Sequence, residues 1–205
     1  MSIKHAKPDH PIQPLLAERW SPYVFSDRPV SNDDLRSLFE ALRWAASSYN
    51  EQPWRYVVAT KENPEEYERL LSCLVEPNQA WARHAPVLVL AVVQTRFERN
   101  DKANPAAEHD LGLAAGNLLA EASARGIDVH QMIGILPDRA RELYAIPEGS
   151  KPLTALAIGY AGDPAAADPQ FAERDQAPRT RRPLRELVFA GRFGTAAELV
   201  EAGAG

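Results

Sequence analysis

Seven consecutive apolar residues, Val87–Val93, constrain the fold of this chain more than any other feature. The run is rich in valine and far too short to span a bilayer as a helix, so it predicts a strand. Successive side chains of a strand point to opposite faces of a sheet, so a strand that is apolar throughout is covered on both faces. The run therefore predicts a strand in the middle of a sheet.

Helices interspersed with strands make up the rest of the predicted chain. Ser31–Asp34 supplies a cap and acidic residues before apolar positions at helical spacing, which predicts a helix over 33–46. Residues 163–178 are rich in Ala, Pro and charge and predict an irregular surface crossing. The order favours a layered α/β or α+β domain. The other predicted helices are 65–75, 78–84, 105–125 and 138–144, and the other predicted strands are 56–59, 127–133 and 153–160.

Two glycines interrupt the longest predicted helix, 105–125. Gly112 and Gly116 each cost about 1 kcal/mol relative to alanine, and their spacing of four places them on one face. We expect another backbone to approach this face closely, either from the same subunit or from a partner across a twofold axis. The middle of the helix is apolar nearly all round, so we also expect it to be buried.

Length, charge and cysteine content exclude several classes of protein. The chain has 205 residues, which suits a single domain over 1–205 with a core at about 16–188. The net charge of -5 argues against a nucleic-acid footprint over the whole surface. Cys73 is the only cysteine, so it fits a reducing compartment and is expected as a buried thiol. With no signal-peptide pattern or membrane-spanning run, we expect a cytoplasmic protein without membrane contact.

The common catalytic motifs are absent from the sequence. There is no G-x-S-x-G elbow, no P-loop and no G-x-G-x-x-G after a strand. Glu108–Asp110 contains three possible metal ligands in a row. Consecutive residues of a helix point in different directions, however, whereas metal sites on helices use spacings of three or four. No metal site is predicted.

Polar residues instead cluster where predicted elements begin or end. Taken singly, such groups are typical of helix caps or solvated surface. Together they match a ligand with chemically distinct parts, because arginines bind phosphate through paired hydrogen bonds and short hydroxyls and amides suit a polyol or the edge of a heterocycle. Backbone N–H groups beside a glycine can also approach a ring closely. The clusters are Arg19–Ser21, Ser47–Asn50, Gln131–Gly134 and Arg179–Pro183.

The order of these clusters resembles the FMN-dependent nitroreductase family. That family has R-x-S near its N-terminus and S-S-x-N-x-Q-P-W before a strand, and this chain has Arg19–Ser21 and Ser47–Trp54. Further matches extend the resemblance over about Leu16 to Val188. They include Asn78-Gln79, Asp110-x-Gly112 and Arg179-x-Arg181. The resemblance implies an α+β fold, a three-layer α/β/α sandwich around a mixed, mainly antiparallel sheet, in an intertwined homodimer.

The resemblance also implies two FMN sites at the subunit interface. Arg19 and Ser21 would meet the phosphate and ribityl chain, and Arg179 and Arg181 would complete the phosphate site. The 47–50 cluster would reach the flavin from the partner subunit. Ile133 and Gly134 would offer backbone N–H groups to the flavin N5 and O4 edge, and Asn78 is a candidate for the pyrimidine edge. The full expected set is Arg19, Trp20, Ser21, Tyr23, Ser47, Ser48, Asn50, Asn78, Gln131, Met132, Ile133, Gly134, Arg179 and Arg181.

The implied activity is hydride transfer from NADH or NADPH through FMN to a small organic acceptor such as a nitroaromatic, a quinone or an enone, with ping-pong kinetics. Flavin N5 carries this chemistry, so no catalytic side chain is expected. Tyr23 stands where many family members carry a basic residue near flavin N1 and O2, which is expected to lower the flavin potential.

Three alternatives remain open from the sequence. A flavoenzyme of the same fold could carry out reductive dehalogenation or flavin fragmentation. The protein could also bind FMN without catalysis. The arginines of 179–185 could contact nucleic acid.

Overall fold

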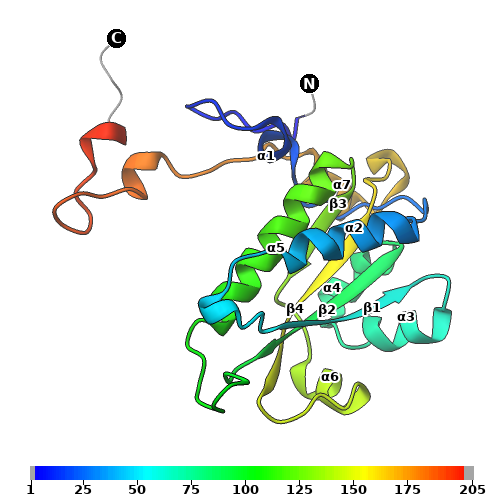
Figure 1. The fold of residues 1–205 in the computed structure, drawn as a ribbon. Coiled ribbons are helices and arrows are strands. Elements are labelled where there is room, and N and C mark those ends of the chain that lie inside the picture. Colours follow the sequence, from blue (N-terminus) through cyan, green and yellow to red (C-terminus); the bar gives the residue numbers. More distant parts are fainter. Residues whose placement is uncertain (1–2, 201–205) are drawn as a thin grey trace.

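An antiparallel sheet with the strand order β1-β2-β4-β3 forms the centre of the molecule (Figure 1). The structure is a computed structural model that describes residues 3–200. The strand predicted from the apolar run is confirmed in the inner position, and its residues 87–93 are all buried. The strands are β1 (Trp54–Thr60), β2 (Val87–Gln94), β3 (Asp128–Met132) and β4 (Ser150–Gly159).

Helices cover both faces of this sheet, which confirms the layered α+β fold. Figure 1 shows α2 and α5 in front of the sheet, and their residues share one core with it. Residues of α3 and α4 pack in the core on the other face. All the predicted helices are present, with ends shifted by a few residues. Their bounds are α1 (Pro14–Glu18), α2 (Asn32–Arg43), α3 (Pro64–Leu71), α4 (Glu76–Ala82), α5 (Ala107–Ala124), α6 (Pro137–Leu143) and α7 (Pro169–Gln176).

The alternation of β2 divides the interior into two hydrophobic cores. Leu88, Leu90 and Val92 point into one core, together with residues of α3, α4 and α7. Val87 and Val89 point into the other core, with residues of α2 and α5. Each face of the strand therefore buries its own layer, which is the physical reason for a run that is apolar throughout.

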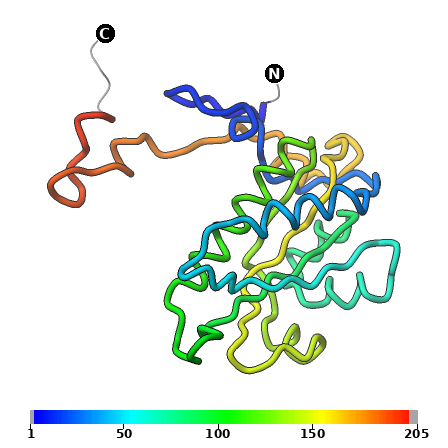
Figure 2. The backbone as a smooth tube through the Cα atoms, viewed as in Figure 1, coloured from blue at the N-terminus to red at the C-terminus, as the bar shows by residue number. Residues whose placement is uncertain are grey.

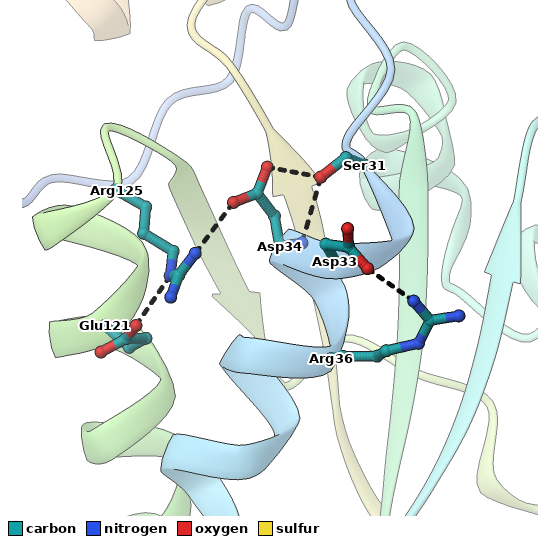
Figure 3. Close-up of polar contacts among 6 residues, drawn as sticks. All are labelled: Ser31, Asp33, Asp34, Arg36, Glu121 and Arg125. Atoms are coloured by element: carbon teal, nitrogen blue, oxygen red, sulfur yellow. Dashed lines mark hydrogen bonds and ion pairs between the residues drawn. The ribbon is translucent and has the colours of Figure 1, made fainter.

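A network of polar contacts joins the start of α2 to the end of α5 (Figure 3). Ser31 caps α2, since its Oγ accepts a hydrogen bond from the backbone N–H of Asp34 at 3.0 Å. The Asp34 carboxylate also binds Arg125 beyond the end of α5 at 3.1 Å, and Arg125 pairs with Glu121 at 2.7 Å. The pair Asp33–Arg36 is exposed and stays within α2. The Asp34–Arg125 ion pair therefore links the start of α2 to the residue after α5.

The helix α5 is buried on one side only, which corrects the expectation of a helix buried all round. Leu111, Ala114 and Leu118 are buried, whereas Gly112 and Gly116 are exposed. Apart from the helix's own backbone, a Cβ atom added to either glycine would meet no atom of residues 3–200 within 4 Å. The close approach of another backbone from the same subunit is therefore wrong for the part of the chain that the structure describes.

Residues 163–178 contain a helix that the sequence reasoning missed. The helix α7 begins where the Asp168 side chain accepts the backbone N–H of Gln170 at 2.9 Å, with Pro169 at the first helical position. Phe171 and Asp175 are its buried residues. The helix was missed because an Ala- and Pro-rich composition hides a short helix that tertiary contacts hold in place.

The last described segment, 178–200, extends away from the sheet (Figure 2). This C-terminal arm starts beside α1 and the N-terminal segment, and it ends far from the rest of the molecule. It exposes Leu187, Leu199 and Phe193, whose side chain is 97% exposed. No helix within residues 3–200 is long and apolar enough to cross a membrane.

Candidate functional site

Arg19, Arg179 and Arg181 come together from the two ends of the chain, and we call them the arginine cluster. Burial, and then the nearby Arg181, lower the pKa of Arg19. Burial, and then Arg19 and Arg181, lower the pKa of Arg179. Mutual repulsion of this kind marks a local excess of positive charge, which is relieved when an anion binds.

The three arginines differ in the hydrogen bonds that they make within the protein. Nη1 of Arg179 donates to the carbonyl oxygens of Lys4 at 3.0 Å and Ala17 at 2.8 Å, so Arg179 also ties down the N-terminal segment. Arg181 is exposed and donates to the carbonyl of its neighbour Thr180 at 2.7 Å. A surface cavity of about 460 Å³ is lined by residues 179–184, Arg179 and Arg181 among them, and by residues 6–10 and Ile12 of the N-terminal segment.

Arg19 also lies next to the segment that carries Ser21. Nη1 of Arg19 is 3.4 Å from Oγ of Ser21. The Asp128 carboxylate at the start of β3 stabilises the charged form of Arg19 and so partly offsets the lowering of the Arg19 pKa. Burial raises the pKa of Asp128 itself. Trp20, between the two candidates, has the Lys4 ammonium 5.1 Å from its ring centroid. The structure thus brings Arg19, Trp20 and Ser21 to one end of β3.

Tyr23 is part of an aromatic cluster. Its ring lies edge-on to Trp81 at 5.2 Å and to His130 at 4.6 Å, and parallel to Phe171 at 6.1 Å. Nδ1 of His130 is 2.8 Å from the carbonyl oxygen of Pro22, so Nδ1 carries the proton. Burial lowers the pKa of His130 and favours this neutral form. The Tyr23 side chain is therefore used for packing against other rings.

The other end of β3 leads into a turn at residues 133–134, where the backbone N–H of Ile135 binds the Ile133 carbonyl at 2.8 Å. Ile133 is 81% exposed, whereas Met132 is buried and Gln131 lies 3.4 Å from Thr154 Oγ1. Nδ2 of Asn78 donates to the Gly134 carbonyl at 2.9 Å.

A larger residue at position 134 would force the side chains of Asn78 and Val75 to move. A Cβ at this position would collide with Nδ2 of Asn78 and lie 2.9 Å from Cγ2 of Val75. The backbone N–H of Val75 also binds the Gly134 carbonyl, at 3.1 Å. Asn78 therefore holds the turn in position through its amide group.

Backbone strain distinguishes the loop of residues 47–52. Tyr49, Asn50 and Gln52 have φ angles of 55°, 57° and 49°, in the left-handed region that side chains disfavour. Oδ2 of Asp110, a residue only 2% exposed, accepts the backbone N–H of Ser48 at 2.8 Å. Oγ of Ser47 accepts the N–H of Gln52 at 3.0 Å. Strain that is held in this way is typical of functional loops.

The 47–52 loop and the arginine cluster lie at opposite ends of α5 (Figure 1). Asp110 binds Ser48 near the start of the helix, and Ser123 binds the carbonyl of Leu15 near its end at 2.7 Å. These two anchors are separated along α5 by about 20 Å. By contrast, the arginine cluster and the 133–134 turn lie at the two ends of one edge strand, β3, about 17 Å apart. The structure therefore groups the candidate residues into two sets.

Similar proteins include two that are named for a flavin. A crystal structure described as an oxidoreductase containing FMN has 34% sequence identity and a TM-score of 0.85, covering 91% of this chain and 95% of that one. The major NAD(P)H-flavin oxidoreductase of Aliivibrio fischeri is 27% identical over 191 residues, 74% of this chain and 88% of its own. An uncharacterized 15.4 kDa protein of Mycolicibacterium smegmatis is 36% identical over 124 residues, 60% of this chain and 82% of that protein.

A family comparison decides the identity of the fold. The model of the Nitroreductase family matches residues 16–160. The chain belongs to the nitroreductase family. It is therefore an oxidoreductase, and the resemblance drawn from its motifs is confirmed. The family match ends before Arg179 and Arg181, so these two arginines lie outside the matched region.

Two buried carboxylates beside the candidate residues were left out of the set expected from the sequence. Asp110 holds the 47–52 loop, and Asp175 accepts the backbone N–H groups of Tyr23 and Val24. Asp110 was noted in the motif Asp110-x-Gly112 without a role in the site, whereas Asp175 gave no signal in a charged segment. No group of three or more His, Cys, Asp or Glu side chains able to hold a metal occurs within residues 3–200.

Proposed function

We propose that this nitroreductase-family chain binds FMN between two copies of itself and transfers hydride from NADH or NADPH to a small organic acceptor. The observation that carries the proposal is the arginine cluster, because its excess positive charge fits a phosphate. The 133–134 turn, with Ile133 81% exposed, lies at the far end of the same strand. Together they suit a long ligand with an anionic end and a planar polar end.

The separation of the two sets of residues supports a site shared between subunits. A ligand that lies along β3 meets the arginine cluster and the 133–134 turn of one chain. The 47–52 loop of that chain lies about 20 Å from the arginine cluster along α5, measured between the helix anchors. A second copy related by a twofold axis can supply its own 47–52 loop instead.

Two surfaces of the chain suit such a dimer. The exposed face of α5 carries Gly112 and Gly116, next to Leu113, which is 40% exposed, so a second backbone can approach closely there. The C-terminal arm exposes large apolar side chains and extends away from its own sheet (Figure 2). A second copy would bury both surfaces, which supports the intertwined arrangement.

The chemistry divides between the cofactor and this chain. When bound, FMN supplies hydride acceptance and donation at N5. The chain's own residues bind and orient: Arg19 and Arg181 hold the phosphate, and the backbone of 133–134 faces the reactive edge of the ring. Gly134 and Asn78 fix that backbone by the contacts described above. A nitroaromatic, a quinone or an enone would serve as acceptor.

The proposal is tested with the purified protein. We expect a flavin absorbance that NADH or NADPH bleaches without oxygen, parallel lines in steady-state kinetics, and a dimeric mass in solution. Arg181→Met removes one of the proposed phosphate contacts and should weaken FMN binding. Arg182→Met is its matched control, since it removes the same charge at the next position. A colourless monomer that refuses added FMN would overturn the proposal. If NADH or NADPH reduces the flavin but none of the three acceptor classes is turned over, the reduction of FMN is supported and the proposed acceptors are contradicted.

A further inference from the structure

We infer that Asp175 is a positioning residue for the cofactor, which it serves by fixing the backbone of residues 21–24. This inference rests on the proposed FMN site. Asp175 lies on α7, more than 150 positions from the segment it holds. It is 4% exposed, and it is one of two aspartates among the buried residues of the described chain. An isolated buried carboxylate is costly, so its partners indicate why it is there.

Both carboxylate oxygens of Asp175 are used on two consecutive backbone N–H groups. Oδ1 accepts from Tyr23 at 2.9 Å, and Oδ2 accepts from Val24 at 2.9 Å and from Tyr23 at 3.1 Å. Two adjacent N–H groups can meet one planar carboxylate only when the peptide between them is held in one orientation. Asp175 therefore restricts the segment that begins with Ser21.

Two other side chains of α7 contact the Tyr23 ring. Phe171 lies four residues before Asp175, so these two side chains project toward the same side of the helix, and Arg174 lies next to them on its exposed flank. The Phe171 ring is parallel to that of Tyr23 at 6.1 Å, and the Arg174 guanidinium lies 5.0 Å from the Tyr23 ring centroid. The Lys4 ammonium donates to the Arg174 carbonyl at 2.7 Å. Burial lowers the pKa of Lys4, and the nearby charge of Asp175 opposes that shift. The helix thus clamps both backbone and ring.

The clamp acts on the phosphate side of the proposed site. Arg19 and Ser21 lie a few residues before Tyr23 and Val24, and His130 binds the carbonyl of the intervening Pro22 at 2.8 Å. If the segment samples other conformations, the apparent affinity for the ligand falls in proportion to the competent fraction. Asp175 would therefore raise affinity for the phosphate without touching it.

Asp175→Asn is the variant that tests this role. Asparagine offers one acceptor oxygen, and its NH₂ group cannot accept from the second N–H. We expect the FMN dissociation constant to rise about tenfold. Riboflavin lacks the phosphate, so its dissociation constant should change by less than about twofold. Tyr23 and Val24 amides should exchange hydrogen faster in the variant.

Asp168→Ala is the matched control for a merely structural effect. It removes the side-chain cap of α7, which binds the Gln170 N–H, but leaves the contacts of Asp175 in place. It should lower the melting temperature while keeping the wild-type ratio of riboflavin to FMN dissociation constants. If Asp175→Asn does not fold, Asp175→Glu replaces it, because the extra methylene shifts both oxygens, and the same fall in the ratio is expected.

The outcomes separate this inference from the proposed function. A fall in the riboflavin-to-FMN ratio in the Asp175 variant alone supports the positioning role. An unchanged ratio, or the same fall in Asp168→Ala, overturns it while leaving the FMN site intact. Wild-type protein that binds no FMN defeats the proposed function first, and the positioning role with it.

Discussion

The two ends of α5 carry candidate site residues in opposite physical conditions. Near its C-terminal end, the arginine cluster gathers like charges, but residues 19–24 contain no backbone angle in the left-handed region. Near its N-terminal end, the 47–52 loop contains three of the five described non-glycine residues with positive φ. One end is electrostatically unfavourable and the other is conformationally strained. In both, a buried aspartate, Asp175 or Asp110, holds the backbone.

This contrast indicates that the ends would respond differently to the ligand and to mutation. A charge excess is relieved when an anion binds, so residues there should affect affinity more than folding. Strain is present in the free protein, so residues in the loop should affect stability directly.

Arg181→Met should have the largest effect and tests the charged end. Removal of one charge-assisted contact to a phosphate should weaken FMN binding by about 10-fold to 100-fold. The free energy of unfolding without FMN should stay the same or rise slightly, because Arg181 repels Arg19 and Arg179. Flavin titration and urea unfolding measure the two quantities. Arg179→Met provides the contrast, since it also breaks the bonds to Lys4 and Ala17 and should lower stability.

Asp110→Asn tests the anchor of the strained end. We expect the free energy of unfolding to fall by about 2 kcal/mol, because the bond from the Ser48 N–H to a buried carboxylate is weakened or left unmade. Urea denaturation measures the change. Glu108→Gln is a suitable control two residues away, since its pair with Lys151 is exposed and should contribute less than about 1 kcal/mol. Equal losses in both variants would contradict the anchor.

A pair of variants at Tyr49 isolates the strain itself. Tyr49→Gly and Tyr49→Ala both remove the ring contacts with Phe97 and Arg99. Only glycine adopts a φ of 55° without cost, so the glycine variant should be more stable than the alanine variant by about 1 kcal/mol. Thermal unfolding of the two proteins side by side gives the difference. A more stable alanine variant would show that the loop is not strained.

The pH dependence of stability tests the His130 contact at the charged end. Burial lowers the pKa of His130 from 6.5, so the unfolded chain takes up its proton first as the pH falls. Stability should be constant above about pH 6.5 and should decrease below it, by less than about 1.4 kcal/mol per pH unit. His130→Gln should have a shallower decrease in unfolding experiments between pH 7 and 5. The raised pKa of Asp128 acts in the opposite direction and is shared by both proteins.

Much of the architecture could be predicted from local patterns. The apolar run 87–93 predicted a strand that β2 confirms, and capping residues Ser31–Asp34 predicted α2. These succeeded because period and capping depend on neighbouring residues. The helix α7 could not be predicted, since Phe171 and Asp175 stabilise it through contacts with residues 23–24, far away in the sequence.

The sequence by itself determined the family, the layered fold and the residue types of the candidate site, because these follow from motif order and periodicity. Only the tertiary structure decided which candidates meet. It brought Arg19 close to Arg179 and Arg181 and left the 47–52 loop at the far end of α5. It also placed the Tyr23 ring inside an aromatic cluster. The physical reason is that burial, backbone strain and the spacing along α5 and β3 exist only once distant segments pack together.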